Sequence, residues 1–105
     1  PAAFIAQYPD NKVFGPAVFY LRGLIAEGLE DQESAISQYK RALEKNARHS
    51  KSRLRIAEIM AHQGHLRDAK EHLELLVSNP RLLAPKDLAR AYYLHAQYSQ
   101  LKKED

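Results

Sequence analysis

Three histidines lie close together in the sequence and are the residues with the clearest potential for chemistry. His62, His65 and His72 surround Gly64 in the stretch IMAHQGHLRDAKEHL. Imidazole nitrogens bind zinc and other transition metals, which raises the question of a metal site. A zinc site needs three or four converging ligands, and His72 lies about two helical turns beyond His65. We therefore expect a turn between two helices here, and no bound metal.

No other combination of residues in the sequence predicts catalysis. The chain has no cysteine, which excludes thiolate chemistry and disulfides. It also contains no glycine-rich phosphate loop and no serine in a nucleophile-elbow pattern. The acidic group Glu27, Glu30, Asp31 and Glu33 falls at a helix end and in the first turn of the next helix, where negative charge stabilises the helix dipole. We expect a protein that is not an enzyme and carries no cofactor.

Positive charge is concentrated in one part of the chain. The whole sequence has 16 Lys and Arg against 13 Asp and Glu. Between residues 40 and 55, however, Glu44 is the only acidic residue, and the cations there form a predicted basic patch: Lys40, Arg41, Lys45, Arg48, Lys51, Arg53 and Arg55. Such a patch can attract an acidic protein, anionic lipid or nucleic acid phosphates, or it can be an ordinary solvated edge. No aromatic residues are interleaved to stack on bases, so we rank nucleic acid last.

The elements that must position these residues are predicted to be helices. Ala, Leu, Glu, Lys, Arg and Gln dominate, and alternation at period two is not sustained. No run reaches the roughly 18 apolar residues that a membrane span needs. With 105 residues, 45% of them hydrophobic, the chain is predicted to be one small all-α domain of about five helices.

Residue types that commonly start or end helices predict the bounds of these helices. Gly15-Pro16 predicts a helix over 16–28, and Asp31 can cap a second over 32–46. Ser50 is a candidate cap for a third, which Gly64 would close in a left-handed conformation.

The remaining bounds follow from the same signals. A fourth helix is expected over 66–78. After the connector NPRLLAP, Pro85 can begin a fifth that continues through Leu101. Residues 3–8 are apolar and are expected to be the end of a helix that stops at Pro9.

The sequence contains an internal repeat in which position i matches position i+34. We call this spacing the repeat offset. By this offset Ala35 matches Ala69, and Gly23 matches Ala57. The turn at 29–31 corresponds to the turn at 63–65. A third copy begins after the connector, where YYLHA at residues 92–96 resembles FYLRG at residues 19–23.

On these residues and this period, the chain resembles the tetratricopeptide repeat family. The resemblance implies antiparallel helix pairs stacked as a right-handed solenoid, in which small residues such as Gly23, Ala57 and Ala96 let paired helices approach. It divides the single domain, 1–105, into a tail of an upstream helix and link at 1–15, a first repeat at 16–48, a second at 49–83, and the first helix of a third repeat, or a capping helix, at 84–105. Arg53 departs from the family pattern, because an apolar residue is expected there.

The resemblance also implies a function and a site. Members of this family are scaffolds that bind a peptide or helix of a partner in a concave groove lined by the first helix of each pair. Carried over to this chain, the groove residues are Tyr20, Leu24, Glu27, Leu54, Glu58, Ala61, His62, Tyr93, Gln97 and Gln100. The Lys and Asn clamp of the chaperone-binding members is missing, since Tyr20, Leu24, Leu54 and Glu58 stand at its positions.

Two alternatives to the groove remain open. The chain can serve as a segment for homo-oligomerisation or for assembly within a larger protein, with the terminal helix 85–101 as the contact. It can also bind an acidic partner through the basic patch. The loose repeat and the QYPDN link resemble bacterial envelope and assembly proteins of the family, which favours a soluble protein of the bacterial cytoplasm or periplasm.

Overall fold

The structure is a computed structural model that describes residues 14–104. Within that range the chain is all-helical, with five α-helices, two short 3-10 helices and no strand, which confirms the predicted class. No helix among these residues is long and apolar enough to cross a membrane. The helix end predicted at residues 3–8 lies outside the described residues.

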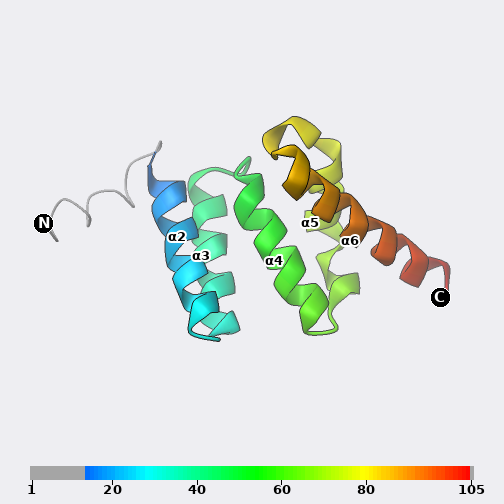
Figure 1. Ribbon diagram of the computed structural model, residues 1–105, viewed down its shortest axis with the longest axis horizontal. Coiled ribbons are helices and arrows are strands. Elements are labelled where there is room, and N and C mark those ends of the chain that lie inside the picture. The colour runs from blue at the N-terminus through cyan, green and yellow to red at the C-terminus, as the bar shows by residue number, and fades with distance from the viewer. Residues whose placement is uncertain (1–13, 105) are drawn as a thin grey trace, which may run out of the picture. The chain divides into compact units, whose positions relative to one another are not determined.

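The described residues fold as two compact units, divided between Ser52 and Arg53 inside α4 (Ser50–His62). The first unit contains α2 (Gly15–Gly28) and α3 (Gln32–Lys45). The second contains the rest of α4 and the elements that follow it, drawn from green to red in Figure 1. These are η2 (Leu66–Ala69), α5 (Lys70–Ser78), η3 (Pro80–Leu82) and α6 (Pro85–Lys103).

In the first unit, α2 and α3 pack closely because small residues lie at their contact. A Cβ atom added to Gly23 would lie 2.3 Å from the ring of Tyr39. Tyr39 is fully buried, and its hydroxyl donates a hydrogen bond to the Glu27 carboxylate. Glycine at position 23 is therefore required by the ring that fills the space between the helices.

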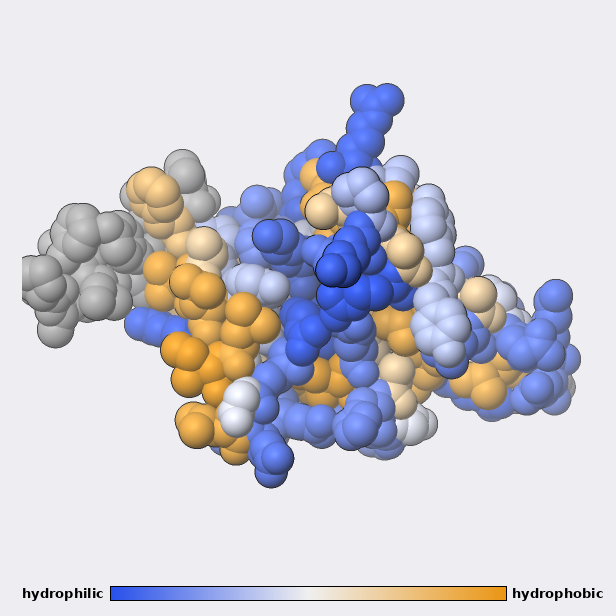
Figure 2. All heavy atoms as spheres, in the orientation of Figure 1, coloured by the Kyte–Doolittle hydropathy of each residue, from blue (hydrophilic) through white to orange (hydrophobic). Residues whose placement is uncertain are grey.

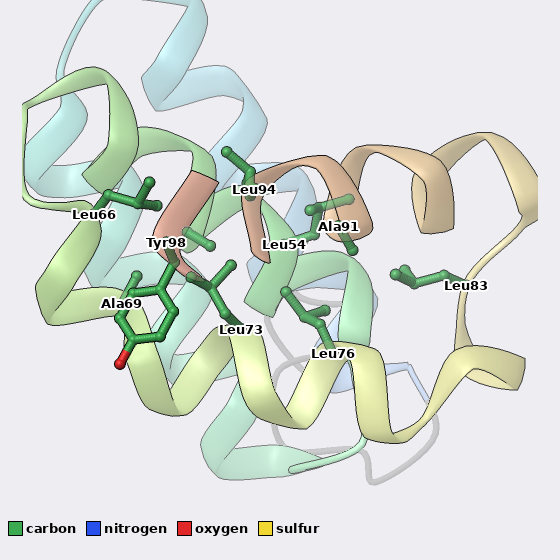
Figure 3. Close-up of a cluster of buried hydrophobic side chains, with 10 residues drawn as sticks. Leu54, Leu66, Ala69, Leu73, Leu76, Leu83, Ala91, Leu94 and Tyr98 are labelled. Carbon is green, nitrogen blue, oxygen red and sulfur yellow. The ribbon is translucent and has the colours of Figure 1, made fainter. Parts of the chain in front are cut away.

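The second unit has a continuous hydrophobic core, drawn in Figure 3. Leucines of α4, η2 and α5 meet α6 there, and Leu83 joins the core from the connector before α6. The members of this core cluster are Leu54, Ala57, Leu66, Ala69, Leu73, Leu76, Leu83, Ala91, Leu94 and Tyr98.

Most helix ends match the predicted signals. The Asp31 side chain caps α3 by accepting hydrogen bonds from the Ser34 backbone N–H at 3.0 Å and from its hydroxyl at 2.7 Å. These two bonds lower the pKa of Asp31. Gly64 follows α4 with a φ of 81°, and Pro85 begins α6.

Two predictions about helix ends were inexact. Ser50 is the first residue of α4 and not its cap. The helix expected over 66–78 begins as a 3-10 turn before it becomes α-helical at Lys70, and His65 at its start makes no side-chain capping bond.

The turns after α2 and α4 are related by the repeat offset and have the same backbone structure. The Asp31 N–H donates to the Ala26 carbonyl at 2.9 Å, and the His65 N–H donates to the Met60 carbonyl at 2.7 Å. Glu30 and Gly64, one residue earlier in each turn, both have a positive φ. The helices that follow begin at the matching positions 32 and 66. The repeat offset therefore holds for the backbone of these two turns.

Candidate functional site

The second unit contains an open cleft between α4 and α6, with a volume of about 540 Å³. It is lined by Glu58, Ala61 and His62 of α4 and by Ala89, Arg90, Tyr93 and Leu94 of α6. Four predicted groove residues, Glu58, Ala61, His62 and Tyr93, thus come together on one surface. We call this surface the α4–α6 cleft.

A second hollow adjoins the α4–α6 cleft, since Ala61 lines both. Its volume is about 400 Å³, and the predicted residues Gln97 and Gln100 line it. Gly64, Leu66 and Leu101 complete its wall. The two hollows share the α4 and α6 helices, so one extended ligand can contact both.

The charged groups beside the α4–α6 cleft neutralise one another. Arg90 donates from Nε to the Glu58 carboxylate at 2.9 Å and from a second guanidinium nitrogen to its other oxygen. A third contact joins Arg90 to Asp87 at 3.0 Å, and Arg55 donates to Glu58 at 3.1 Å. The hydrogen bonds to Glu58 raise the pKa of Arg90. Two arginines and two carboxylates leave no net charge to select a ligand.

The contact surface of the cleft is mainly apolar. Leu94 is 7% exposed and belongs to the core, while 65% of Tyr93 is exposed. Ala61 and Ala89 are small side chains of the facing walls. The Tyr93 hydroxyl accepts a hydrogen bond from the Gln97 amide at 3.3 Å. A ligand would meet an aromatic ring, two alanines and a few polar tips.

Four predicted groove residues lie elsewhere. Leu54 is 2% exposed in the core, so its assignment to the groove was wrong: α4 turns this side chain toward α5 and α6. Tyr20, Leu24 and Glu27 belong to α2 of the first unit. Tyr20 packs there on Tyr39, with ring centroids 5.8 Å apart, and Glu27 accepts the Tyr39 hydroxyl. Leu24 is half-buried.

The structure removes two residues from the predicted basic patch. Arg53 is 9% exposed and donates to Nδ1 of His72 at 3.0 Å, and burial lowers the pKa of its guanidinium. Arg55 is paired with Glu58. The remaining cations are exposed side chains of the first unit: Lys40, Arg41, Lys45, Arg48 and Lys51.

The three histidines near Gly64 have different surroundings. His62 is exposed in the last turn of α4, beside the α4–α6 cleft, and His65 is exposed after the turn. His72 faces Arg53, and its Nδ1 must accept because a guanidinium only donates. Between residues 14 and 104, no three histidine or carboxylate side chains are grouped so as to hold a metal ion.

Sequence reasoning missed two features. Ala89, Arg90 and Leu94 were not assigned to the groove, although Ala89 and Arg90 lie one helical turn before Tyr93 and Leu94 directly follows it. It also missed an exposed apolar stripe formed by Leu21 and Ile25 of α2 and by Leu29, which caps the helix; these residues are 56%, 63% and 75% exposed. Figure 2 shows hydrophobic residues gathered over this helix. Their spacing of four along a helix was the available signal.

Comparison of the chain with protein-family models, with curated proteins and with solved structures gives no match.

Proposed function

We propose that this chain is a tetratricopeptide-type interaction module without enzymatic activity, which binds a segment of another protein in the α4–α6 cleft. The observation that carries the proposal is the convergence of Glu58, Ala61, His62 and Tyr93 from two helices far apart in the sequence. The matching backbone of the two turns supports the family resemblance, and a right-handed stack of helix pairs is what that resemblance implies.

The chemistry of the cleft defines the ligand that it fits. The charges are balanced and the walls are apolar, so the anchor of the ligand is an uncharged Leu, Met or Phe that packs on Tyr93 and Ala61. The Tyr93 hydroxyl and the amides of Gln97 and Gln100 can bond to the backbone of the ligand. A short peptide or helix with one apolar anchor and polar flanks satisfies both requirements.

The proposal is tested with peptides selected from a random library that carries one fixed leucine. Affinity is then measured by fluorescence anisotropy for Tyr93→Ala and Ala61→Arg, with Tyr92→Ala as the matched control. Tyr92 precedes Tyr93 on α6 but does not line the cleft. We expect at least tenfold weaker binding for the two cleft variants and little change for the control. Equal binding by all three, or no selected peptide, would contradict the proposal.

The exposed stripe on α2 favours a second function, the assembly of copies of this chain through Leu21, Ile25 and Leu29. Two α2 helices can pair antiparallel and bury their apolar faces against each other. Light scattering over a concentration series should then show a dimer that Ile25→Glu dissociates. A monomer at every concentration would exclude this assembly and leave the cleft proposal intact.

A further inference from the structure

Helix α6 presents three different sides. Ala91, Leu94 and Tyr98 are buried in the core of the second unit. Arg90 and Tyr93 line the α4–α6 cleft. The third side carries Tyr92, 48% exposed, and Ala96, also exposed, one turn apart. Neither of these two residues lines either hollow.

The internal repeat shows which surface this third side corresponds to. Tyr92 and Ala96 match Phe19 and Gly23 of α2 in the alignment of YYLHA with FYLRG. In α2 these positions form the contact with α3: Phe19 is 6% exposed, and Gly23 approaches the ring of Tyr39. The matching small residue of α4, Ala57, is 0% exposed in the core. A position that is buried in two copies is therefore exposed in the third.

The two buried copies also show what covers such a surface. In the first, α3 contributes the fully buried residues Ala35, Tyr39 and Ala42. In the second, Ala69, Leu73 and Leu76 of η2 and α5 are also 0% exposed. Both helical segments share one spacing: a small residue, a large apolar residue four positions later, and a third apolar residue three positions after that.

We propose that Tyr92 and Ala96 form a docking site for an amphipathic helix of a partner chain that has this spacing of contact residues. The small side chain of Ala96 lets the partner backbone approach, as Gly23 and Ala57 do within the chain. The large apolar residue of the partner packs beside Ala96 and against the ring of Tyr92. This site goes beyond the proposed function, because Tyr92 and Ala96 line neither of the two hollows.

The docking site adjoins the α4–α6 cleft, because Ala96 lies one turn after Tyr93, but the two sites use different residues. Consecutive residues of an α-helix point about 100° apart, so Tyr92 and Tyr93 face different surroundings although they are neighbours in the chain. Exposed Ala96 and Gln97 form a second such pair. Substitutions at neighbouring positions can therefore distinguish a helix docked on the Tyr92 side from a peptide bound in the cleft.

The probe is a synthetic peptide with the sequence of residues 31–46 in which Tyr39 is replaced by Leu, because Ala96 matches Ala57, which the chain covers with Leu73. The peptide has the required spacing and keeps its Asp31 cap. It is titrated into the isotope-labelled chain while the amide NMR signals of α6 are followed. Isolated helices of about this length are marginal in water, so we expect weak binding, with a Kd on the order of 1 mM or tighter. The expected shifts centre on Tyr92 and Ala96.

Two variants and a control peptide decide the result. Ala96→Arg should weaken binding at least tenfold, whereas Gln97→Arg should leave it unchanged, and both positions are exposed, so the fold is retained. A peptide in which the residue matching Ala35 is replaced by Glu should not bind. Shifts confined to the cleft, shifts confined to α2, or no saturable shift would each overturn the docking site. None of these outcomes alters the peptide-selection test of the cleft, which depends on Tyr93 and Ala61.

Discussion

Glu30 and Gly64, which the repeat offset relates, occupy the same position in two turns of the same structure, with φ values of 60° and 81°. A left-handed residue closes each helix so that the next can begin two residues later. Glycine adopts this conformation without steric cost, whereas glutamate does not. The first turn therefore keeps its geometry at the expense of some stability.

Replacing Glu30 with glycine should stabilise the protein. The left-handed conformation costs an L-residue about 1–2 kcal/mol, part of which the greater chain entropy of glycine offsets. We expect Glu30→Gly to raise the free energy of unfolding by up to about 1 kcal/mol, and Gly64→Ala to lower it by about the same amount, measured by urea unfolding. Gly28→Ala is the control, because that position has no atom within 4 Å of an added Cβ and no positive φ. Destabilisation by Glu30→Gly would show that the glutamate conformation is not strained.

The contact between Gly23 and Tyr39 should give a large coupling energy. Gly23→Ala places a methyl group against a buried ring that cannot move away, and overpacking of this kind costs about 1–3 kcal/mol. The second copy has Ala57 and Leu73 at the matching positions, which avoids this clash. In a Tyr39→Leu background, Gly23→Ala should therefore cost less. A double-mutant cycle by urea unfolding measures the difference, and additive effects would contradict the packing described.

His49 should make stability depend on pH. Burial, and secondarily the charge of Lys51, lower the pKa of His49 below 6.5 in the folded chain. The unfolded chain takes up a proton on His49 at higher pH than the folded chain. The contribution of neutral His49 to the free energy of unfolding is therefore fully present above about pH 6.5, and it is lost as pH decreases toward the folded pKa.

Urea unfolding of His49→Gln across this range should show a smaller loss than that of the unsubstituted chain. His65→Gln is the control at an exposed site. If His49→Gln and the unsubstituted chain lose equal stability between pH 7 and 5, roughly the range in which a histidine changes charge, the effect belongs to another group.

Glu58 should control the charge preference of the α4–α6 cleft. Glu58→Gln leaves Arg55 and Arg90 with Asp87 as the remaining carboxylate of the group, so the cleft gains one positive charge. Peptides with an acidic flank should then bind more tightly at low salt, by about threefold to tenfold, and lose this gain as ionic strength rises. Neutral peptides serve as the control. A gain of equal size for both peptide types would indicate a change in shape and not in charge.

Local signals in the sequence predicted the helices well, because the residues that start and stop them act within one turn. Asp31 determines a boundary through the hydrogen bonds of its side chain, whereas Gly64 and Pro85 do so through backbone conformation. The repeat offset also predicted the matching turns. The 3-10 start of the fourth helix was not predicted, since no residue type in LRDA distinguishes it from an α-helical turn.

The candidate site was predicted only in part, because its composition depends on contacts between distant segments. Leu54 was assigned to the groove, but its direction is decided by α5 and α6 packing on α4. Arg53 was counted as a surface cation, yet it is buried beside His72, which belongs to α5. The pairing of Glu58 with Arg90 likewise joins two helices, and no local pattern in the sequence predicts it.

The most direct test of the proposed function is to map a library-selected peptide onto the labelled chain by amide chemical shifts. Binding in the α4–α6 cleft predicts saturable shifts at Ala61, Arg90 and Tyr93, which disappear in Ala61→Arg and persist in Tyr92→Ala. Shifts that centre instead on the cations of the first unit, or that survive Ala61→Arg unchanged, would contradict the assignment of the cleft as the binding site.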